Sequence, residues 1–343
     1  MGNITIKDIA KKCGVSVTTV SRAINDYPGI NQATKAKIMQ VVRESQFIPN
    51  NSARNLKRLE NNSIVVLVKG LTNPFFNPMI DVLDKVIHNH KYSFVLQRVN
   101  DNEDEIEIAS EIVLEKKPKG IVFLGGYFYH AKEKLKQLDI PCVIGAVGDI
   151  DNKSSDVCSY VHVDDVKESY KMVDYLCKAG HKRIAILAAS EGDKSISALR
   201  VEGYKKALRD HGIPIDEELI RYAKPDEDIY TMARGYNGAK RLLEENVEFT
   251  AIYAISDSLA LGVCRALKEE GKRVPEDYSV VGFDGMDIAS YYIPSITTIR
   301  QPVEEMGEAV AEILFDMIEK DAPIQHKIFE GELLVRESSR CIG

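Results

Sequence analysis

The sequence predicts a small all-α head at the N-terminus, followed by a larger α/β body of two lobes built on parallel sheets. Three observations lead to this fold class. At the start of the chain, apolar residues recur at helical spacing. From Asn62 onward, short apolar runs alternate with amphipathic stretches, and the charge is unevenly distributed along the chain. A length of 343 residues is also enough for roughly two or three domains of ordinary size.

The charge divides the chain into a basic head and an acidic body. The whole chain carries −7, but residues 1–60 contain ten basic and four acidic side chains, which gives +6. The remaining residues therefore carry −13. This asymmetry favours a nucleic-acid-binding head on an acidic body.

The first residues have the signals of two short helices joined by a tight turn. Thr5 and Asp8 have the form of a capping box, and the apolar spacing around them predicts a first helix. Gly14 stands where the end of a helix commonly needs a left-handed backbone, and Ser16 can cap a second helix over residues 17–25. So short a link suits two helices that cross at a steep angle, as in a helix-turn-helix unit.

A third helix, capped by Asn31, is expected to cover the first two with Ile38, Val41 and Val42. An inert three-helix bundle would share this spacing but would not need the exposed face that remains on the second helix. That face consists of Val17, Thr18, Thr19, Ser21 and Arg22. Short hydroxyls suit phosphates, an arginine can read guanine, and an exposed valine can meet a thymine methyl. The head is therefore predicted to be a helix-turn-helix that binds DNA.

A short basic segment follows the head. Pro49 stops the third helix, and Asn50 or Asn51 can cap a further segment over residues 52–58. This segment is too short to be a stable isolated helix. Because it is basic, it would become ordered when DNA phosphates neutralise its arginines and lysine. The alternative is a flexible linker.

The runs IKDIAKKCGVSVTTVSRAIN at residues 6–25 and FIPNNSARNL at residues 47–56 closely resemble the headpiece and hinge of the lac repressor (LacI/GalR) family. By this resemblance Val17, Thr18 and Arg22 read bases, and the hinge folds in the minor groove. Leu56 then wedges into the central base step, although it could instead pack on the next domain. The predicted DNA contacts are Ser16, Val17, Thr18, Thr19, Ser21, Arg22, Asn50, Ala53, Arg54, Leu56 and Lys57.

From Asn62 the chain alternates short apolar runs with amphipathic helical stretches. Continuous apolar strands of this kind indicate parallel sheets that are covered on both faces. A break near residues 161–165 divides the strands into two sets, each large enough for its own lobe, and two lobes imply a cleft. The expected strands cover residues 64–68, 94–99, 120–124, 142–147, 184–188, 251–254 and 280–283.

In such sheets ligands bind beyond the carboxyl ends of the strands. The turn TNPFFN at residues 72–77 presents Phe75 and Phe76, two rings that suit stacking on a sugar or a heterocycle. Either ring could instead pack into its own lobe. Carboxylates and an arginine near other strand ends can hydrogen-bond to a ligand, although each could singly be a helix cap or a surface salt bridge. The candidate effector-binding residues are Asn73, Phe75, Phe76, Tyr127, Asp164, Arg200, Tyr230, Asp257 and Asp284.

The same resemblance runs through the body and implies a two-lobed, type I periplasmic-binding-protein-like domain. The implied divisions are a headpiece at 1–49, a hinge at 50–61, an N-lobe at 62–162 and 291–321, and a C-lobe at 163–290 and 322–343. It also implies a homodimeric repressor that binds a palindromic operator and responds to a small effector. Lys194 and Ile196 depart from purine-responsive members, so a sugar or sugar derivative is expected.

Other classes of function are not expected. The sequence has no phosphate-binding loop, dinucleotide-binding glycine pattern or nucleophile elbow, so we expect no enzyme. The six cysteines lack metal-binding spacing, and neither a metal nor a cofactor is expected. Without an export signal or an apolar run near the roughly 18 residues that span a bilayer, a cytoplasmic protein with no membrane partner is expected. The alternative within the family is a catabolite-control-type regulator that a phosphorylated partner protein switches.

Overall fold

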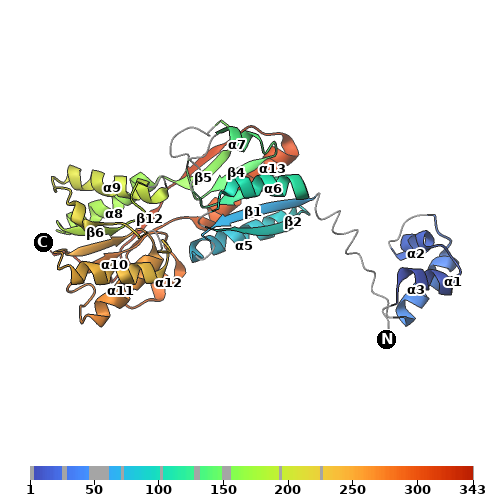
Figure 1. The fold of residues 1–343 in the computed structure, drawn as a ribbon, viewed down its shortest axis with the longest axis horizontal. Helices are drawn as coiled ribbons and strands as arrows, with labels where there is room; N and C mark the ends of the chain where they lie inside the picture. The colour runs from blue at the N-terminus through green and yellow to red at the C-terminus, as the bar shows by residue number, and fades with distance from the viewer. Residues whose placement is uncertain are drawn as a thin grey trace. The chain divides into compact units, whose positions relative to one another are not determined.

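The computed structural model describes residues 4–24, 29–45, 62–70, 73–100, 103–126, 132–148, 156–192, 195–224 and 227–342. The chain divides into two compact units, Met1–Leu59 and Glu60–Gly343, which Figure 1 shows as a helical unit and a larger α/β unit. The predicted hinge contacts Asn50, Ala53, Arg54, Leu56 and Lys57 lie outside the described residues. No helix in the described ranges is long and apolar enough to cross a membrane.

The helical unit contains α1 (Ile6–Cys13), α2 (Val17–Ile24) and α3 (Gln32–Glu44). Its predicted caps are confirmed. The Asp8 carboxylate accepts hydrogen bonds from the Thr5 backbone N–H (2.9 Å) and hydroxyl (2.7 Å), and Gly14 is left-handed with φ 69°. The Ser16 hydroxyl accepts from the Thr19 N–H at 3.1 Å, and Asn31 caps α3.

The three helices share one small core. Ile9 on α1, Val20 on α2 and Ile38 on α3 are fully buried and belong to a single apolar cluster. Since Val20 points inward, the opposite side of α2 faces solvent, and Val17 at its N-terminus is 39% exposed. The predicted exposed face on the second helix is confirmed for Val17.

The first lobe of the larger unit is a six-stranded parallel sheet in the order β11-β5-β4-β3-β1-β2. The strands are β1 (Ser63–Lys69), β2 (Ser93–Val99), β3 (Gly120–Leu124), β4 (Cys142–Gly145), β5 (Ser159–Val163) and β11 (His326–Phe329). The central strand β1 is buried along its whole length, as a strand covered on both faces requires.

Helices cover both faces of this sheet (Figure 1). Inward residues of α5 (Asn77–Asn89) and α13 (Val303–Lys320) pack with Ile64 and Val66 on one face. On the other face α6 (Glu105–Lys116) and α7 (Lys132–Lys136) pack with Val65 and Leu67. A short 3₁₀ helix, η1 (Pro74–Phe76), precedes α5.

The second lobe is a four-stranded parallel sheet in the order β7-β6-β8-β9. Its strands are β6 (Ile184–Leu187), β7 (Ile220–Arg221), β8 (Ala251–Ala254) and β9 (Ser279–Val281). In Figure 1 helices α8 and α9 lie on one side of β6, and α10 and α11 lie on the other. The remaining elements are α8 (Asp165–Lys178), α9 (Ile196–Asp210), η2 (Glu217–Leu219), α10 (Met232–Glu244), α11 (Asp257–Glu269) and α12 (Asp287–Tyr291).

Glycine permits the close contact between α10 and α11. A Cβ atom on Gly262 would lie 1.9 Å from the Met232 carbonyl oxygen, and one on Gly235 would lie 2.0 Å from the Leu259 carbonyl oxygen. Both obstructing atoms are backbone, so neither can move aside cheaply. The close packing of the two helices fixes the position of the first residues of α10. These residues directly follow a loop that lines the cleft between the lobes.

The lobe boundaries differ from the expected ones. We expected residues 291–321 in the N-lobe, but Thr297 and Arg300 bridge to Val281 and Asp284 of the second lobe. We expected the chain to return to the second lobe near residue 322, but β11 still pairs with β5 of the first. The return comes at β12 (Glu332–Leu334), which pairs antiparallel with β10 (Thr298–Arg300). β11 was missed because it is an edge strand with exposed His326 and Lys327 and no continuous apolar run.

The expected break near residues 161–165 lies where the chain leaves the first lobe, although residues 161–163 still belong to a strand. β5 covers Ser159–Val163 and pairs with both β4 and β11. The crossover to the second lobe therefore comes directly after Val163, where α8 begins. Both sheets direct the carboxyl ends of several strands toward the space between the lobes.

Candidate functional site

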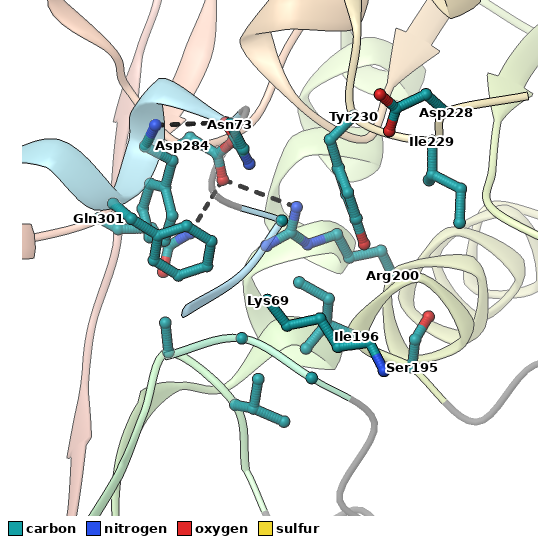
Figure 2. Close-up of a pocket in the computed structure, with 17 residues that line it drawn as sticks. Lys69, Asn73, Ser195, Ile196, Arg200, Asp228, Ile229, Tyr230, Asp284 and Gln301 are labelled. Atoms are coloured by element: carbon teal, nitrogen blue, oxygen red, sulfur yellow. Dashed lines mark hydrogen bonds and ion pairs between the residues drawn. The ribbon is translucent and has the colours of Figure 1, made fainter. Parts of the chain in front are cut away.

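A cleft lies between the two lobes of the larger unit, at the carboxyl ends of strands from both sheets (Figure 2). Lys69 at the end of β1, Gly125 after β3 and Ala146 after β4 contribute to one wall. Arg200 of α9 and the loop segment 228–230 contribute to the other. This is the position at which doubly wound sheets bind ligands.

Arg200 is the central charged group of the second wall. Its side chain is only 2% exposed, and it lies in the second turn of α9. Nε donates to Asp165 at 2.8 Å, Nη1 donates to the Ile255 carbonyl, and Nη1 lies 3.7 Å from the Asp284 carboxylate. The guanidinium also lies 3.7 Å above the centre of the Phe283 ring.

The buried carboxyls around Arg200 outnumber its single positive charge. Burial acts to lower the pKa of Arg200, but the carboxylates of Asp165 and Asp284 outweigh burial and raise its pKa, so the guanidinium stays charged. Burial raises the pKa of Asp284 well above its ordinary value, because one guanidinium cannot fully compensate several buried carboxyls. A ligand hydroxyl at this wall would meet both a strong donor and a strong acceptor.

Asp284 is held by an unusual backbone conformation. Its φ is 109°, a left-handed value that residues other than glycine rarely adopt. Its N–H donates to the Ile299 carbonyl (2.9 Å), and its carbonyl accepts from the Gln301 N–H (3.1 Å). The Gln301 amide also donates to the Asp284 carboxylate at 3.0 Å, as Figure 2 shows. These contacts tie Asp284 to the segment that leads back to the first lobe.

Asp257 does not line the cleft. It is fully buried beside Gly282, where its Oδ2 accepts from the Met286 N–H at 2.7 Å, so it supports the turn that carries Asp284. Its other oxygen, Oδ1, has no hydrogen-bond partner in the described part of the chain. Burial raises the pKa of Asp257 to about 7.

Asp164 does not line the cleft either. It is exposed and caps α8 by accepting from the Lys167 N–H at 3.0 Å. The buried neighbour Asp165 makes the contact with Arg200 instead. Two adjacent aspartates at a helix start compete for the cap, and the sequence alone did not show which of them points inward.

The aromatic turn lies at the cleft, but its rings are less exposed than expected. Phe75 and Phe76 line the cleft yet are only 6% and 7% exposed, and they contact each other edge to face at 5.2 Å between ring centres. The Asn73 side chain accepts from the Phe75 N–H at 3.2 Å and caps the turn. These rings therefore belong to the core and also line the cleft.

Tyr230 lines the opposite wall and points toward Arg200 in Figure 2. Tyr127 lies outside the described residues. Sequence reasoning missed Lys69, Asp228 and Gln301, which also line the cleft. Lys69 ends an apolar strand directly before Gly70, so the rule that ligands bind at strand ends could have found it.

The Lys69 ammonium is compensated from within its own lobe. It donates to the Glu103 carbonyl at 2.7 Å and pairs with Glu105, which is 1% exposed, at 3.1 Å. Arg200 is likewise paired with carboxylates, and Asp228 adds a further negative group at the edge. Among the described residues that line the cleft, the two cationic side chains, Lys69 and Arg200, are thus each paired with a carboxylate.

The second candidate surface is α2 of the helical unit. Ser16, Val17, Thr18 and Arg22 are exposed there, and Thr19 and Ser21 are partly exposed. The hydroxyls of Ser16 and Thr19 lie 2.9 Å apart. The N–H groups at the start of a helix favour an anion such as a phosphate.

Metal chemistry has no structural support in the part of the chain that the structure describes. No group of three or more His, Cys, Asp or Glu side chains there could hold a metal ion. All six cysteines are unpaired thiols.

Comparison with known proteins identifies relatives over nearly the whole chain. Residues 5–50 match the family described as bacterial regulatory proteins, lacI family, and residues 173–339 match a periplasmic binding protein-like domain. The chain is 40% identical to the HTH-type transcriptional regulator MalR of Clostridium butyricum, over 98% of this chain and 99% of that protein. It is 30% identical to the HTH-type transcriptional repressor CytR of Escherichia coli K12, over 98% and 97% of the two chains.

A solved structure supports the fold as well. The transcriptional regulator CelR in complex with cellobiose is similar with a TM-score of 0.71 and 26% identity, covering 98% of this chain and 100% of that one. The match extends across both units of the present chain.

Asp257→Asn should change how stability depends on pH. The folded protein holds the Asp257 proton up to about pH 7, whereas the unfolded chain releases it near pH 4. Between these two pH values the folded protein binds the Asp257 proton and the unfolded chain does not. Protonated Asp257 therefore contributes stability to the parent protein below about pH 4, and this contribution is lost as the pH rises to 7. Relative to the parent, the variant should gain about 2 to 3 kcal/mol of unfolding free energy between pH 5 and pH 8 in urea titrations.

Asp277→Asn is the matched control. A hydrogen bond from Arg273 lowers the pKa of Asp277 to about 2, so this carboxyl stays ionised throughout the range. The difference between that variant and the parent should not change with pH. Identical pH dependence of Asp257→Asn and the parent would show that burial does not keep Asp257 protonated.

Proposed function

Because this chain belongs to the LacI family of bacterial regulatory proteins, we propose that it is a homodimeric repressor whose binding to a palindromic operator is controlled by an uncharged sugar in the inter-lobe cleft. The relatives are transcriptional regulators, so the chain is a DNA-binding regulator rather than an enzyme. The observation that carries the effector proposal is the charge pairing in the described lining of the cleft. Arg200 on one wall lies beside Asp165 and Asp284, and Lys69 on the other wall lies beside Glu105.

The charge of the cleft favours an uncharged ligand. The two cations in its described lining, Lys69 and Arg200, are already paired with Glu105 and Asp165. A phosphate or carboxylate would also meet Asp284 and Asp228, and bringing like charges together in a desolvated site is costly. A sugar hydroxyl can accept from Arg200 and donate to Asp284 at the same time. Phe75, Phe76 and Tyr230 line the cleft, and their aromatic rings suit contact with the apolar face of a sugar ring.

The DNA-binding proposal rests on α2. The exposed Val17, Thr18 and Arg22 are the residues that would read bases, and Ser16, Thr19 and Ser21 would contact phosphates. The segment that contains Asn50, Ala53, Arg54, Leu56 and Lys57 remains the proposed hinge, with Leu56 as the wedge at the centre of the operator. A pyrimidine–purine step is the preferred place for such a wedge, because it is easily unstacked.

A self-complementary surface on the second lobe supports a dimer. Ile288, Tyr291 and Ile293 are 46%, 79% and 88% exposed, which is unusual for such large apolar side chains. Beside them lies an apolar groove lined by Met232, Leu261 and Tyr292. A surface that carries both protruding side chains and a groove can pair with its own copy around a two-fold axis.

The alternative, a regulator switched by a phosphorylated partner protein, lacks a matching surface in the described residues of α13. A phosphorylated partner is usually recognised by exposed arginines or lysines. The exposed residues of α13 are instead mostly acidic, with a lysine, Lys320, only at the C-terminal end; the acidic ones are Glu304, Glu305, Glu308, Glu312 and Glu319. This helix therefore favours control by a small ligand over control by such a partner.

Arg22→Ala should weaken specific binding by about 1 to 3 kcal/mol and relax the preference at one base pair in each half-site. The reason is the loss of a bidentate contact from an exposed guanidinium on α2. Fluorescence anisotropy with a duplex selected from random sequence, and with a scrambled duplex, measures both quantities. Arg43→Ala on α3 is a control that removes the same charge from another helix. Equal losses for both duplexes in Arg22→Ala would contradict the base-reading role.

Ile293→Asp should weaken self-association at least about tenfold, because dimerisation would bury a carboxylate in an apolar interface. Analytical ultracentrifugation over a concentration series measures the dissociation constant. Ile328→Asp introduces the same charge at a residue that is 63% exposed on edge strand β11, and it should leave the constant unchanged. A dimer that tolerates Ile293→Asp would place the interface elsewhere.

Thermal shifts should reveal the effector class. An uncharged sugar present at about 100 times its Kd should stabilise the protein by about 2.7 kcal/mol, whereas sugar phosphates and nucleotides should give no comparable shift. Asp284→Asn keeps the shape of the side chain but replaces one carboxyl oxygen with an amide N–H donor, so it should abolish the sugar-dependent shift. Asp277→Asn should retain it. If a phosphorylated compound gave the largest shift in the panel, the proposed effector class would be wrong.

A further inference from the structure

A single carboxylate, Glu227, lies between two arginines just behind the cleft wall. It accepts from Arg241 through both oxygens, at 2.6 and 3.1 Å, and its Oε2 lies 3.1 Å from Nε of Arg234. The side chains of Arg234, Glu227 and Arg241 are 1%, 14% and 22% exposed. The three residues form a partly buried ion cluster, which we call the Glu227 cluster.

The Glu227 cluster adjoins the loop that forms part of the cleft. Glu227 directly precedes Asp228, Ile229 and Tyr230, all of which line the cleft. The loop is attached at both ends. The Glu227 carboxylate accepts from the Lys224 N–H at 3.0 Å, and the Thr231 hydroxyl donates to the Asp228 carbonyl at 3.0 Å.

The same cluster connects this loop to rigid elements. Nη2 of Arg234 donates to the carbonyls of Arg221 (2.9 Å) and Ala188 (3.4 Å), which lie at the ends of β7 and β6. A Cβ atom on Gly238 would lie 2.5 Å from Nη1 of Arg234, so the guanidinium is packed against the backbone of α10. The Glu227 carboxylate therefore joins the loop both to the sheet and to α10.

The charge of Arg234 depends on Glu227. Arg234 is surrounded by other cations, Arg221 and Arg241, and Glu227 is the carboxylate paired with it in the described ranges. Burial lowers the pKa of Arg234 to about 10, and the hydrogen bonds from Arg241 hold the pKa of Glu227 at about 2. Without the Glu227 carboxylate a desolvated guanidinium would have no counter-charge, which favours its movement toward water.

We propose that Glu227 is a positioning residue that holds the Asp228–Tyr230 loop in the conformation that completes the cleft. It contacts no ligand itself. It acts by fixing a loop of irregular structure, so that the loop is already ordered before a ligand binds. The consequence for ligand affinity rests on the function proposed above, whereas the effect on the loop does not.

A tryptophan reporter tests the loop directly. The chain contains no tryptophan, so Tyr230→Trp in the full-length protein gives a single tryptophan, within the loop, which can be excited selectively over tyrosine. In this background Glu227→Gln should increase acrylamide quenching at least about twofold and shift the emission to longer wavelength. Glu245→Gln is the matched control, because it removes the carboxylate paired with Arg221 at the other end of α10 and should leave quenching unchanged.

The unfolding midpoint of each variant separates local from global effects. If Glu227→Gln fails to fold, Arg241→Gln replaces it, since this change removes one of the two arginines and keeps Arg234 paired. Arg241→Gln should also increase quenching, to a smaller extent. Unchanged quenching in a folded Glu227→Gln variant, or in Arg241→Gln when that variant is used, overturns the proposal.

Cellobiose serves as the probe for the second readout, measured by calorimetry with Tyr230 intact. Glu227→Gln should lower its affinity about tenfold or more, and Glu245→Gln should change it less than twofold. If the parent protein does not bind cellobiose, the uncharged sugar that gives the largest thermal shift replaces it as the probe, while the quenching result still decides the role of Glu227. Increased quenching with unchanged cellobiose affinity would overturn the positioning role.

Discussion

The buried guanidinium of Arg200 is the interaction on which the organisation of the larger unit depends. A cation that is 2% exposed is stable only where carboxylates and carbonyls surround it, and these come from Asp165, Asp284 and Ile255. They lie at the start of α8, after β9 and after β8. Satisfying one charge therefore fixes several strand ends of the second lobe relative to one another.

The same constraint extends toward the first lobe and gives the cleft its chemistry. Asp284 is bound to Gln301, in the connection that leads into α13 of the first lobe. A ligand that contacts Arg200 and Asp284 would thus act on a segment that passes between the lobes. A ligand shifts a conformational equilibrium only when its contacts differ between the two states, and contacts made through this segment would differ if the lobes moved relative to each other.

Much of the fold was predictable because its signals are local. Thr5, Gly14, Ser16 and Asn31 act as caps or turns through contacts within a few residues, and buried strands such as β1 are continuous apolar runs. The failures involve long-range contacts. The edge strand β11 is defined only by its pairing with β5, and Asp165 rather than Asp164 faces inward because Arg200 lies there. The compensation of Lys69 by Glu105 likewise depends on two residues that the sequence places far apart.

The central claim is that a sugar at the Arg200 wall controls the affinity of the head for DNA. The most direct test is anisotropy of the full-length protein with a selected operator duplex, with and without the sugar that gives the largest thermal shift. The account predicts a change in DNA affinity of about 5 to 150-fold, and an equal change in sugar affinity when the duplex is bound. Identical DNA affinities in the two conditions would contradict it.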